Sequence, residues 1–261
     1  MRCLAAALAG IVAAVGGMPV NAQGGQTPRV AVIIDDMGQH AARGERALAL
    51  PGPLAYAFLP QAPHTRDLAG LAHRRGKEVL LHQPMQAAGR EGAGPGRIAL
   101  ATTREALQRR VARNLAAVPH AAGVNNHEGS LITRHPGHMT WLMKALRERG
   151  GLFFVDSRTT ARTVAERMAR EVGVPAIERD IFLDHRREAT RIHAQFDRLL
   201  ATARREGAAV AIGHPHPQTL AVLKNRLRRL QEADVELVAV SALVSESSEE
   251  ADAPWHVSSS P

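Results

Sequence analysis

The chain has 261 residues, of which 45% are hydrophobic and 22% charged, as expected of a folded globular chain rather than a disordered one. Aromatic residues make up only 3%, which argues against a protein that recognises bases or sugars by stacking on aromatic platforms. A single cysteine excludes a disulfide scaffold. The net charge is +8, but the sequence contains no run of five like charges and so does not indicate a nucleic-acid partner.

The first 22 residues have the features of a secretory signal peptide. Arg2 precedes an apolar run at residues 4–15, and Val20-Asn21-Ala22 forms a small-x-small cleavage pattern. This run of twelve residues is too short to span a bilayer, because a membrane-spanning helix needs about 20 apolar residues. We therefore expect cleavage after Ala22 and a periplasmic or extracellular protein with no integral membrane segment thereafter. An uncleaved anchor or a buried first helix is the alternative.

Short apolar runs alternate with amphipathic stretches through the rest of the chain. The predicted strands cover residues 29–34, 54–59, 78–81, 121–124, 152–155, a weak run around Ile177, 208–212 and 235–240. The predicted helices cover residues 65–75, 103–117, 139–149, 160–172, 188–206 and 219–233.

This alternation predicts βαβ units and a parallel sheet. Seven or eight such units in one α/β domain favour a barrel, closed or incomplete, and an open doubly wound sheet is the alternative. We assign the domain to residues 29–244, after a short linker at 23–28. The Ser- and Glu-rich tail at 245–261 is predicted to be disordered.

Almost every predicted strand ends in a residue that can bind a metal or transfer a proton. These residues are Asp35, Asp36, His82, His127, Asp156, Asp184 and His214. In parallel α/β folds the carboxyl ends of the strands form one face, so these side chains should converge there. Carboxylates and imidazoles together form a ligand set for Zn²⁺ or a similar divalent ion.

Six segments around these strand ends resemble the divergent polysaccharide deacetylases, and the resemblance runs from about residue 29 to residue 244. The segments are residues 32–38, 58–60, 79–85, 123–130, 153–159 and 211–217. The resemblance implies a distorted (β/α)7-type barrel and a metal-dependent enzyme that removes acetyl groups from a glycan. It also implies an acetylated glycan or oligosaccharide of the cell envelope as the partner.

The resemblance also assigns roles to residues. Asp35 matches the general base, Asp36 a metal ligand and His214 the general acid that protonates the leaving group. The parent family's histidine pair would fall on His82 and position 86, but position 86 is glutamine, so His127 is the expected third ligand. Zinc is the expected metal, with cobalt or nickel as alternatives.

The remaining candidates are expected to bind substrate or support the ligands. Asn125, Asn126, Ser157 and Arg158 could bind substrate, and Asp156 could orient a histidine or stabilise its charge. Asp184 and His216 are further candidates without an assigned role. The sequence differs from the family pattern at Gln83, Gln86 and Glu128.

Two other functions remain open from the sequence. The fold could belong to a non-catalytic envelope protein that binds a glycan or a protein partner, because a fold does not determine a function. A different metal hydrolase on the same scaffold is the other alternative.

Overall fold

The computed structural model describes residues 27–90 and 94–252. The strands are β1 (Arg29–Met37), β2 (Ala55–Phe58), β3 (Glu78–Met85), β4 (Gly123–Glu128), β5 (Phe153–Asp156), β6 (Ala176–Glu178), β7 (Ile181–Phe182), β8 (Ala208–Gly213) and β9 (Glu236–Leu237). The α-helices are α1 (Ala41–Leu48), α2 (Thr65–Arg74), α3 (Arg104–Ala117), α4 (Pro136–Arg149), α5 (Ala165–Val172), α6 (Ala189–Glu206), α7 (Pro217–Leu227) and α8 (Val240–Asp252). Two short 3-10 helices lie at Ile132–Arg134 and Gln231–Ala233. The predicted signal peptide lies outside the described residues.

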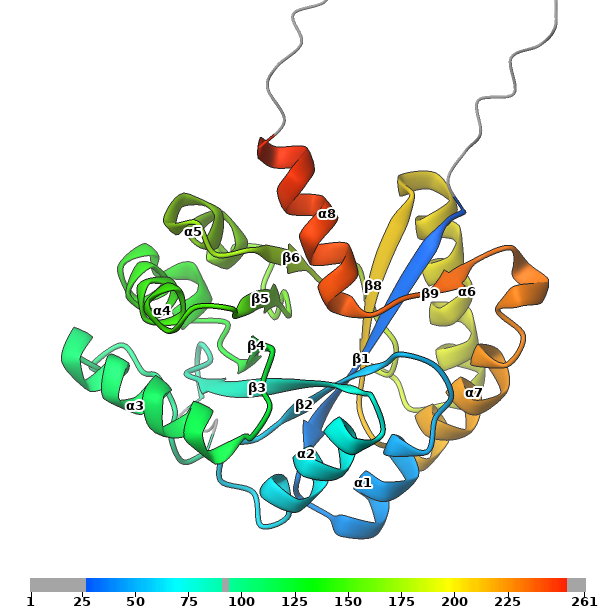
Figure 1. Ribbon diagram of the computed structural model, residues 1–261, viewed down its shortest axis with the longest axis horizontal. Helices are drawn as coiled ribbons and strands as arrows, with labels where there is room; N and C mark the ends of the chain where they lie inside the picture. The colour runs from blue at the N-terminus through cyan, green and yellow to red at the C-terminus, as the bar shows by residue number, and fades with distance from the viewer. Residues whose placement is uncertain (1–26, 91–93, 253–261) are drawn as a thin grey trace, which may run out of the picture.

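The strands form one parallel sheet in the order β6-β5-β4-β3-β2-β1-β8-β7, and β9 also pairs with β1. Helices α1 to α7 lie around the outside of the curved sheet, whereas α8 lies on its other side (Figure 1). The prediction of a distorted parallel α/β barrel is confirmed. The doubly wound alternative is wrong, because the sheet curls around one interior and carries α1 to α7 on its outer face rather than on both faces.

The barrel is completed by a single short segment rather than by pairing of its two edge strands. β6 pairs with β5, and β7, only two residues later, pairs with β8. The residues between them bond to both sides: Arg179 N–H donates to Asp156 O at 2.9 Å, and Asp180 N–H donates to Val210 O at 2.9 Å. The sequence analysis found β6 but missed β7, which has only two residues.

Successive side chains of each strand face opposite sides of the sheet, and this alternation divides the core in two. The larger apolar cluster lies between the sheet and the outer helices and includes Val32, Leu81 and Phe154. A smaller cluster fills the barrel interior and includes Ile33 and Leu80. Both clusters use β-branched and other large aliphatic side chains, which is why strands with two buried faces read as continuous apolar runs.

Helix α8 contradicts two predictions about the end of the chain. The strand expected at residues 235–240 is only two residues long, and Val240 begins α8. The tail expected to be disordered from residue 245 is helical as far as Asp252. The physical reason is that Val240 and Leu243 pack into the interior cluster, while the Glu78 carboxylate accepts a hydrogen bond from Val240 N–H at 2.7 Å. The helix thereby covers the amino-terminal opening of the barrel.

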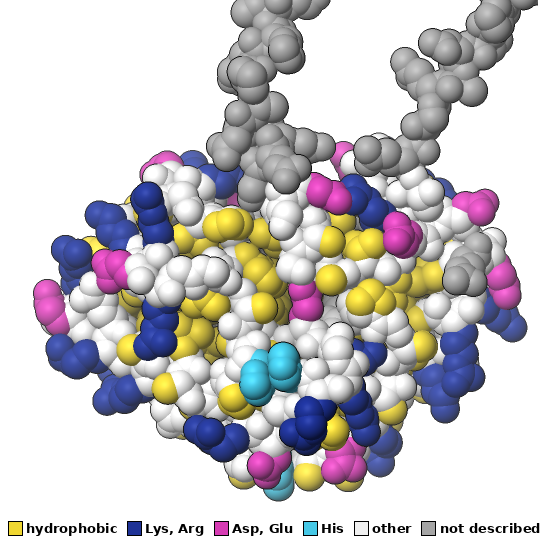
Figure 2. All heavy atoms as spheres, viewed as in Figure 1, with side chains coloured by type: hydrophobic (Ala, Val, Ile, Leu, Met, Phe, Trp, Pro, Cys, Tyr) yellow, Lys and Arg dark blue, Asp and Glu magenta, His cyan; other side chains and the backbone are white. Residues whose placement is uncertain are grey.

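Charged side chains are scattered over the surface. On the face drawn in Figure 2, Lys and Arg alternate with Asp and Glu around the periphery and do not gather into one basic patch. Among the described helices, none is both long enough and apolar enough to cross a membrane.

Candidate metal centre and active site

The alternating direction of side chains along each strand places the predicted site residues at the barrel mouth. Each polar residue lies two positions after an apolar residue of the interior cluster and therefore faces the same way. The pairs are Ile33 and Asp35, Leu80 and His82, Val155 and Ser157, and Ile212 and His214. In β4, Gly123 packs against the Phe153 ring of that cluster, and Asn125 and His127 follow it on the same face.

Asp36 breaks the alternation and reaches the same site as its neighbour. Its φ of 55° lies in the left-handed region, which Asp tolerates better than most residues. The pairing of β1 with β2 also shifts register between Ile34 and Met37. Two consecutive carboxylates, Asp35 and Asp36, therefore both face the barrel mouth.

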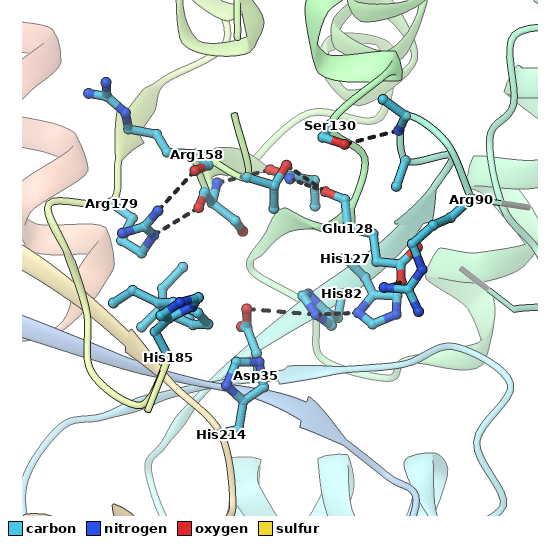
Figure 3. Close-up of a pocket in the computed structure, with 17 residues that line it drawn as sticks. Asp35, His82, Arg90, His127, Glu128, Ser130, Arg158, Arg179, His185 and His214 are labelled. Atoms are coloured by element: carbon cyan, nitrogen blue, oxygen red, sulfur yellow. Dashed lines mark hydrogen bonds and ion pairs between the residues drawn. The ribbon is translucent and has the colours of Figure 1, made fainter. Parts of the chain in front are cut away.

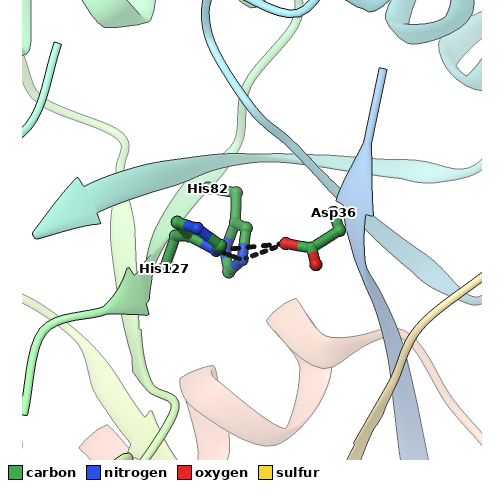
Figure 4. A group of neighbouring side chains, drawn as sticks. All are labelled: Asp36, His82 and His127. Atoms are coloured by element: carbon green, nitrogen blue, oxygen red, sulfur yellow. Dashed lines mark hydrogen bonds and ion pairs between the residues drawn. The ribbon is translucent and has the colours of Figure 1, made fainter. Parts of the chain in front are cut away.

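Three ligand atoms converge on a small triangle. The distance from Asp36 Oδ1 to His127 Nδ1 is 3.1 Å, from Asp36 Oδ1 to His82 Nε2 3.3 Å, and from His127 Nδ1 to His82 Nε2 3.1 Å. Figure 4 shows both imidazoles turned toward the carboxylate. Ligands at about 2.0–2.1 Å from a tetrahedral metal are about 3.3 Å apart, so the triangle has the dimensions of a metal site.

The chemistry of the triangle also fits a divalent cation. Asp36 Oδ1 is buried and, among the described residues, accepts no hydrogen bond. A buried carboxylate oxygen without a partner is costly, and a cation would satisfy it. One carboxylate and two imidazoles leave further coordination positions open, as in hydrolytic zinc sites.

The second nitrogen of His82 is held by its neighbour. His82 Nδ1 lies 2.7 Å from the amide oxygen of Asn125, which can only accept, so Nδ1 carries the proton and Nε2 presents its lone pair to the triangle. The amide nitrogen of Asn125 donates to Asp35 Oδ1 at 2.8 Å. Asn125 therefore fixes the orientation of both a predicted ligand and the predicted base.

The electrostatics of the triangle favour positive charge. Burial raises the pKa of Asp36, but His127 and His82 outweigh burial and hold the pKa of Asp36 well below its usual range. Burial lowers the pKa of His82, yet the charges of Asp35 and Asp36 raise it overall. The negative charges of Asp35 and Asp36 would also stabilise a bound cation.

Asp35 is a buried carboxylate with one oxygen available. Burial raises the pKa of Asp35 above its usual value, against the opposing effects of His82 and His214. Its Oδ1 accepts from Asn125, whereas Oδ2 lies 3.7 Å from His82 Nε2. A carboxylate of raised pKa beside a metal site is suited to accept a proton from water.

His214 is held by Asp184. His214 Nδ1 lies 2.9 Å from Asp184 Oδ1, and His214 N–H donates to Asp184 Oδ2 at 2.7 Å. Burial lowers the pKa of His214, but the hydrogen bond and the charge of Asp184 outweigh it and raise the pKa to about 9. The imidazole is therefore protonated at neutral pH, and its Nε2 faces the site, 3.8 Å from Asp36 Oδ2.

Asp184, His214 and His216 also lie close enough to suggest a second metal site. The oxygens of Asp184 are already occupied, because Oδ2 accepts from Thr219 Oγ1 at 2.7 Å as well as from His214 N–H. His216 is half-buried, and its ring stacks 5.7 Å from that of His214. This cluster orients His214 rather than presenting free ligand atoms.

These residues open into a cavity of about 550 Å³ (Figure 3). Asp35, His82, His127 and His214 line one part of it. A smaller hollow of about 140 Å³ lies on the other side of Asp36 and His214 and includes His216.

Two predicted residues, Asp156 and Asn126, belong to the other alternation of their strands, although Asn126 still lines the cavity. Among the described residues, Asp156 forms no hydrogen bond or ion pair with a histidine: its carboxylate accepts from Arg158 N–H at 2.8 Å and from Thr163 Oγ1 at 2.6 Å. The expectation that Asp156 orients a histidine is wrong. Asn126 binds the backbone, accepting from Ser157 N–H at 2.9 Å, and so joins the ends of β4 and β5.

Ser157 and Arg158 line the cavity, as a substrate-binding role requires. The Arg158 side chain, however, forms an ion pair with Glu178. The backbone of Arg158 has a positive φ of 47°, and that of Glu128, at the end of β4, has one of 53°. Together with Asp36, these residues place three left-handed, non-glycine positions around the site, a concentration typical of functional regions.

Arg90, Arg179, Phe182 and His185 also line the cavity, and the sequence pattern does not single them out. Arg179 and Phe182 lie on the segment that joins β6 to β7, whose path depends on both edges of the sheet. No residue motif around them signals a site. Asp180 joins this segment to β8, since its carboxylate accepts from Val210 N–H at 2.8 Å, and only the fold shows this contact.

The comparisons with known proteins agree with this geometry. The profile described as divergent polysaccharide deacetylase matches residues 32–244. Uncharacterized protein YibQ of Escherichia coli K12 is 38% identical over 218 residues, covering 84% of this chain and 68% of that protein. An uncharacterized protein of Haemophilus influenzae Rd is 40% identical over 217 residues, covering 82% and 76%.

A solved structure shares the fold. The crystal structure of uncharacterized protein ATU2773 from Agrobacterium tumefaciens C58 has a TM-score of 0.80 at 25% identity, covering 84% of this chain and 90% of that one. The profile match spans the strands that carry Asp35, His82, His127 and His214. With its curled parallel sheet and its polar strand ends, the chain belongs to the divergent polysaccharide deacetylase family.

Proposed function

We propose that this protein is an exported, metal-dependent hydrolase that removes acetyl groups from a glycan of the cell envelope. The triangle of Asp36 Oδ1, His82 Nε2 and His127 Nδ1 carries the proposal, because its sides of 3.1 to 3.3 Å match a metal site. Zinc is the proposed ion, with cobalt or nickel as alternatives. Family membership supports the acetyl group as the group that is removed.

When bound, a divalent metal at this triangle polarises a carbonyl oxygen and lowers the pKa of a coordinated water. Asp35 accepts the proton of the attacking water through Oδ2, the oxygen that Asn125 does not bind. Its raised pKa brings the strength of this base closer to that required near neutral pH.

His214 supplies the proton that the leaving sugar needs. The imidazole is protonated at neutral pH, and Asp184 keeps Nδ1 engaged, so the proton on Nε2 is the one that can be donated. Donation to the departing nitrogen or oxygen prevents release of a strongly basic leaving group. This role requires no change in the position of His214.

The cavity supports a short glycan rather than a long one. Its volume is about 550 Å³, and Phe182 is the one Phe, Tyr or Trp among the residues described along its wall. Long glycan grooves commonly bind several sugar rings on aromatic faces. We therefore propose an oligosaccharide or a chain end as the substrate.

Acetate release tests the proposal. The chain from Gln23 onward is incubated with a panel of acetylated glycans in the presence of Zn²⁺, Co²⁺, Ni²⁺ or a chelator, and bound metal is measured by elemental analysis. We expect metal-dependent release that falls at least ~100-fold in His127→Ala, since even residues that only support a ligand contribute 10- to 100-fold.

The matched control is His73→Ala, which removes an exposed histidine that stacks on His120, outside the cavity. This variant should retain both metal and activity. No acetate release from any glycan, together with no metal in the purified protein, would reject the metal-dependent hydrolase and favour a binding protein.

Export is tested separately. The full chain is expressed in a bacterium, and the amino terminus of the protein recovered from the periplasm is sequenced. Cleavage before Gln23 is expected, and an uncleaved protein in the cytoplasmic fraction would contradict it.

A further inference from the structure

One guanidinium in the cavity wall has no part in the acetyl hydrolysis proposed above. Arg179, in the link between β6 and β7, donates from Nε to Ser157 O at 2.8 Å and from Nη2 to Arg158 O at 2.9 Å. Two backbone carbonyls thus hold the planar group in one orientation. Figure 3 shows it on the opposite side of the view from His127 and Arg90.

Arg179 has no carboxylate partner among the described residues, unlike the other arginines of the cavity. Arg158 forms an ion pair with Glu178, and Arg90 Nη1 lies 3.7 Å from Glu128 Oε1. The carboxylates that act on Arg179 through space, those of Asp156, Asp35 and Asp180, form no ion pair with it. Of the five N–H groups of a guanidinium, three form no hydrogen bond with any described residue, including both on Nη1.

A second polar group beside Arg179 also lacks a partner. Ser157 lines the cavity and is only 6% exposed, yet its hydroxyl forms no hydrogen bond with any described residue. A buried hydroxyl without a partner carries a free-energy cost that a bound ligand removes. Ser157 and Arg179 are joined directly, since the carbonyl of the one accepts from the guanidinium of the other.

Phe182 connects this pair to the reacting groups. The guanidinium carbon of Arg179 lies 5.3 Å from the centroid of the Phe182 ring, and that ring is 5.4 Å from the ring of His214. One small saccharide is therefore long enough to contact Arg179 at one end and the proposed proton donor, His214, at the other.

We propose that Arg179 and Ser157 form a subsite for an anionic group, a carboxylate or a phosphate ester, carried by the acetylated sugar. A half-buried guanidinium that forms no ion pair with a described carboxylate is well suited to an anion, because its remaining N–H groups form charge-assisted, two-pronged hydrogen bonds. The identity of the ligand as an acetylated sugar rests on the proposed function. The preference for an anion rests on Arg179 and Ser157 alone.

Calorimetric binding tests this subsite without requiring turnover. N-acetylglucosamine is compared with N-acetylmuramic acid, which adds a carboxylate, and with N-acetylglucosamine 6-phosphate, which adds a phosphate. Hydrogen bonds to charged groups contribute enough for roughly 10- to 100-fold tighter binding of the anionic sugar. We expect Arg179→Gln to abolish this preference and Arg179→Lys, which keeps the charge but not the fork, to retain part of it.

Arg147→Gln is the matched control. Arg147 also donates to a backbone carbonyl, that of Val172 at 2.7 Å, but it lies on α4 outside the cavity. This variant should keep the preference for the anionic sugar. The comparison separates the anion subsite from a general loss of charge or of one backbone hydrogen bond.

The outcome for the subsite is independent of the outcome for hydrolysis. Anionic preference that depends on Arg179, without acetate release, would support the subsite and reject the hydrolase. Equal affinity for neutral and anionic sugars, an unchanged preference in Arg179→Gln, or no binding of either anionic sugar at millimolar concentration would overturn the subsite, whether or not acetate is released.

Discussion

Two clusters of histidine and aspartate lie at the barrel mouth. They contain the same residue types, but the carboxylates differ in their hydrogen bonds. In the first, one atom each of Asp36, His82 and His127 come together, and the Asp36 oxygen is buried and accepts no hydrogen bond from a described residue. In the second, Asp184 binds His214 and Thr219 through well-formed hydrogen bonds. The difference lies in the neighbours of the carboxylate and not in the ligand types.

This comparison shows how hydrogen-bond satisfaction separates a ligand set from an orienting pair. Among the described residues, two imidazole nitrogens lie close to the inner oxygen of Asp36, so a cation would complete its environment. Asp184 is completed by donors from β8 and α7, so it stabilises the charged form of His214 instead. Distance between His and Asp side chains alone would have treated both clusters as metal sites.

The largest expected effect comes from removing the carboxylate charge of the first cluster. In Asp36→Asn, we expect metal affinity and acetate release to fall more than ~100-fold, because the change removes a ligand rather than a residue that supports one. Metal content by elemental analysis and acetate release measure the two effects. Retention of metal at wild-type affinity would show that the triangle is not the metal site.

Asp184→Asn should separate the clusters. We expect kcat to fall about 100-fold, as for loss of an effective general acid, because His214 loses the charge that keeps it protonated. Metal content should stay at the wild-type level. Loss of metal in this variant would place the ion in the second cluster.

Asn125→Leu tests the connection between the proposed ligand His82 and the proposed base Asp35. The side chains have similar volumes, but leucine cannot accept from His82 or donate to Asp35. We expect metal affinity to fall roughly 10-fold, in the range for a residue that orients a metal-binding histidine. A thermal melt of the metal-free protein shows whether the variant is folded, and unchanged affinity in a folded variant would contradict the orienting role.

The smallest effect is expected for His216→Ala. His216 belongs to the second cluster, but its side chain is half-buried and contacts His214 only by ring stacking. Metal content and acetate release should stay within about 2-fold of wild type, since the half-buried side chain forms no capping hydrogen bond and its removal leaves the bonds between Asp184 and His214 in place. A large loss of metal would mean that the second cluster also binds an ion.

Much of this site could be anticipated from the alternation within each strand. Ile33 precedes Asp35 by two positions, and Leu80 and Ile212 stand in the same relation to His82 and His214. Because residues two apart in a strand face the same side, an apolar residue in the barrel interior places a polar residue at its mouth. The sequence alone therefore determined the parallel α/β architecture, the strand ends and the gathering of these side chains.

Other features depended on contacts between distant parts of the chain. The left-handed backbone of Asp36 turns it toward the site, whereas Asp156 follows the regular alternation and faces its own loop. Helix α8 continues into a polar tail because its first turn packs into the barrel and is capped by Glu78. Local propensity does not include these contacts, so the tail reads as disordered.

The tertiary structure alone decided which polar groups have partners. Asp36 and Asp184 are both aspartates at strand ends, and Arg179 is one arginine among many. Only the folded chain reveals that, among the described residues, hydrogen bonds saturate Asp184, Asp36 Oδ1 lacks one and Arg179 forms no ion pair. Hydrogen bonding and burial depend on neighbours contributed by several strands, and a linear pattern does not specify those neighbours.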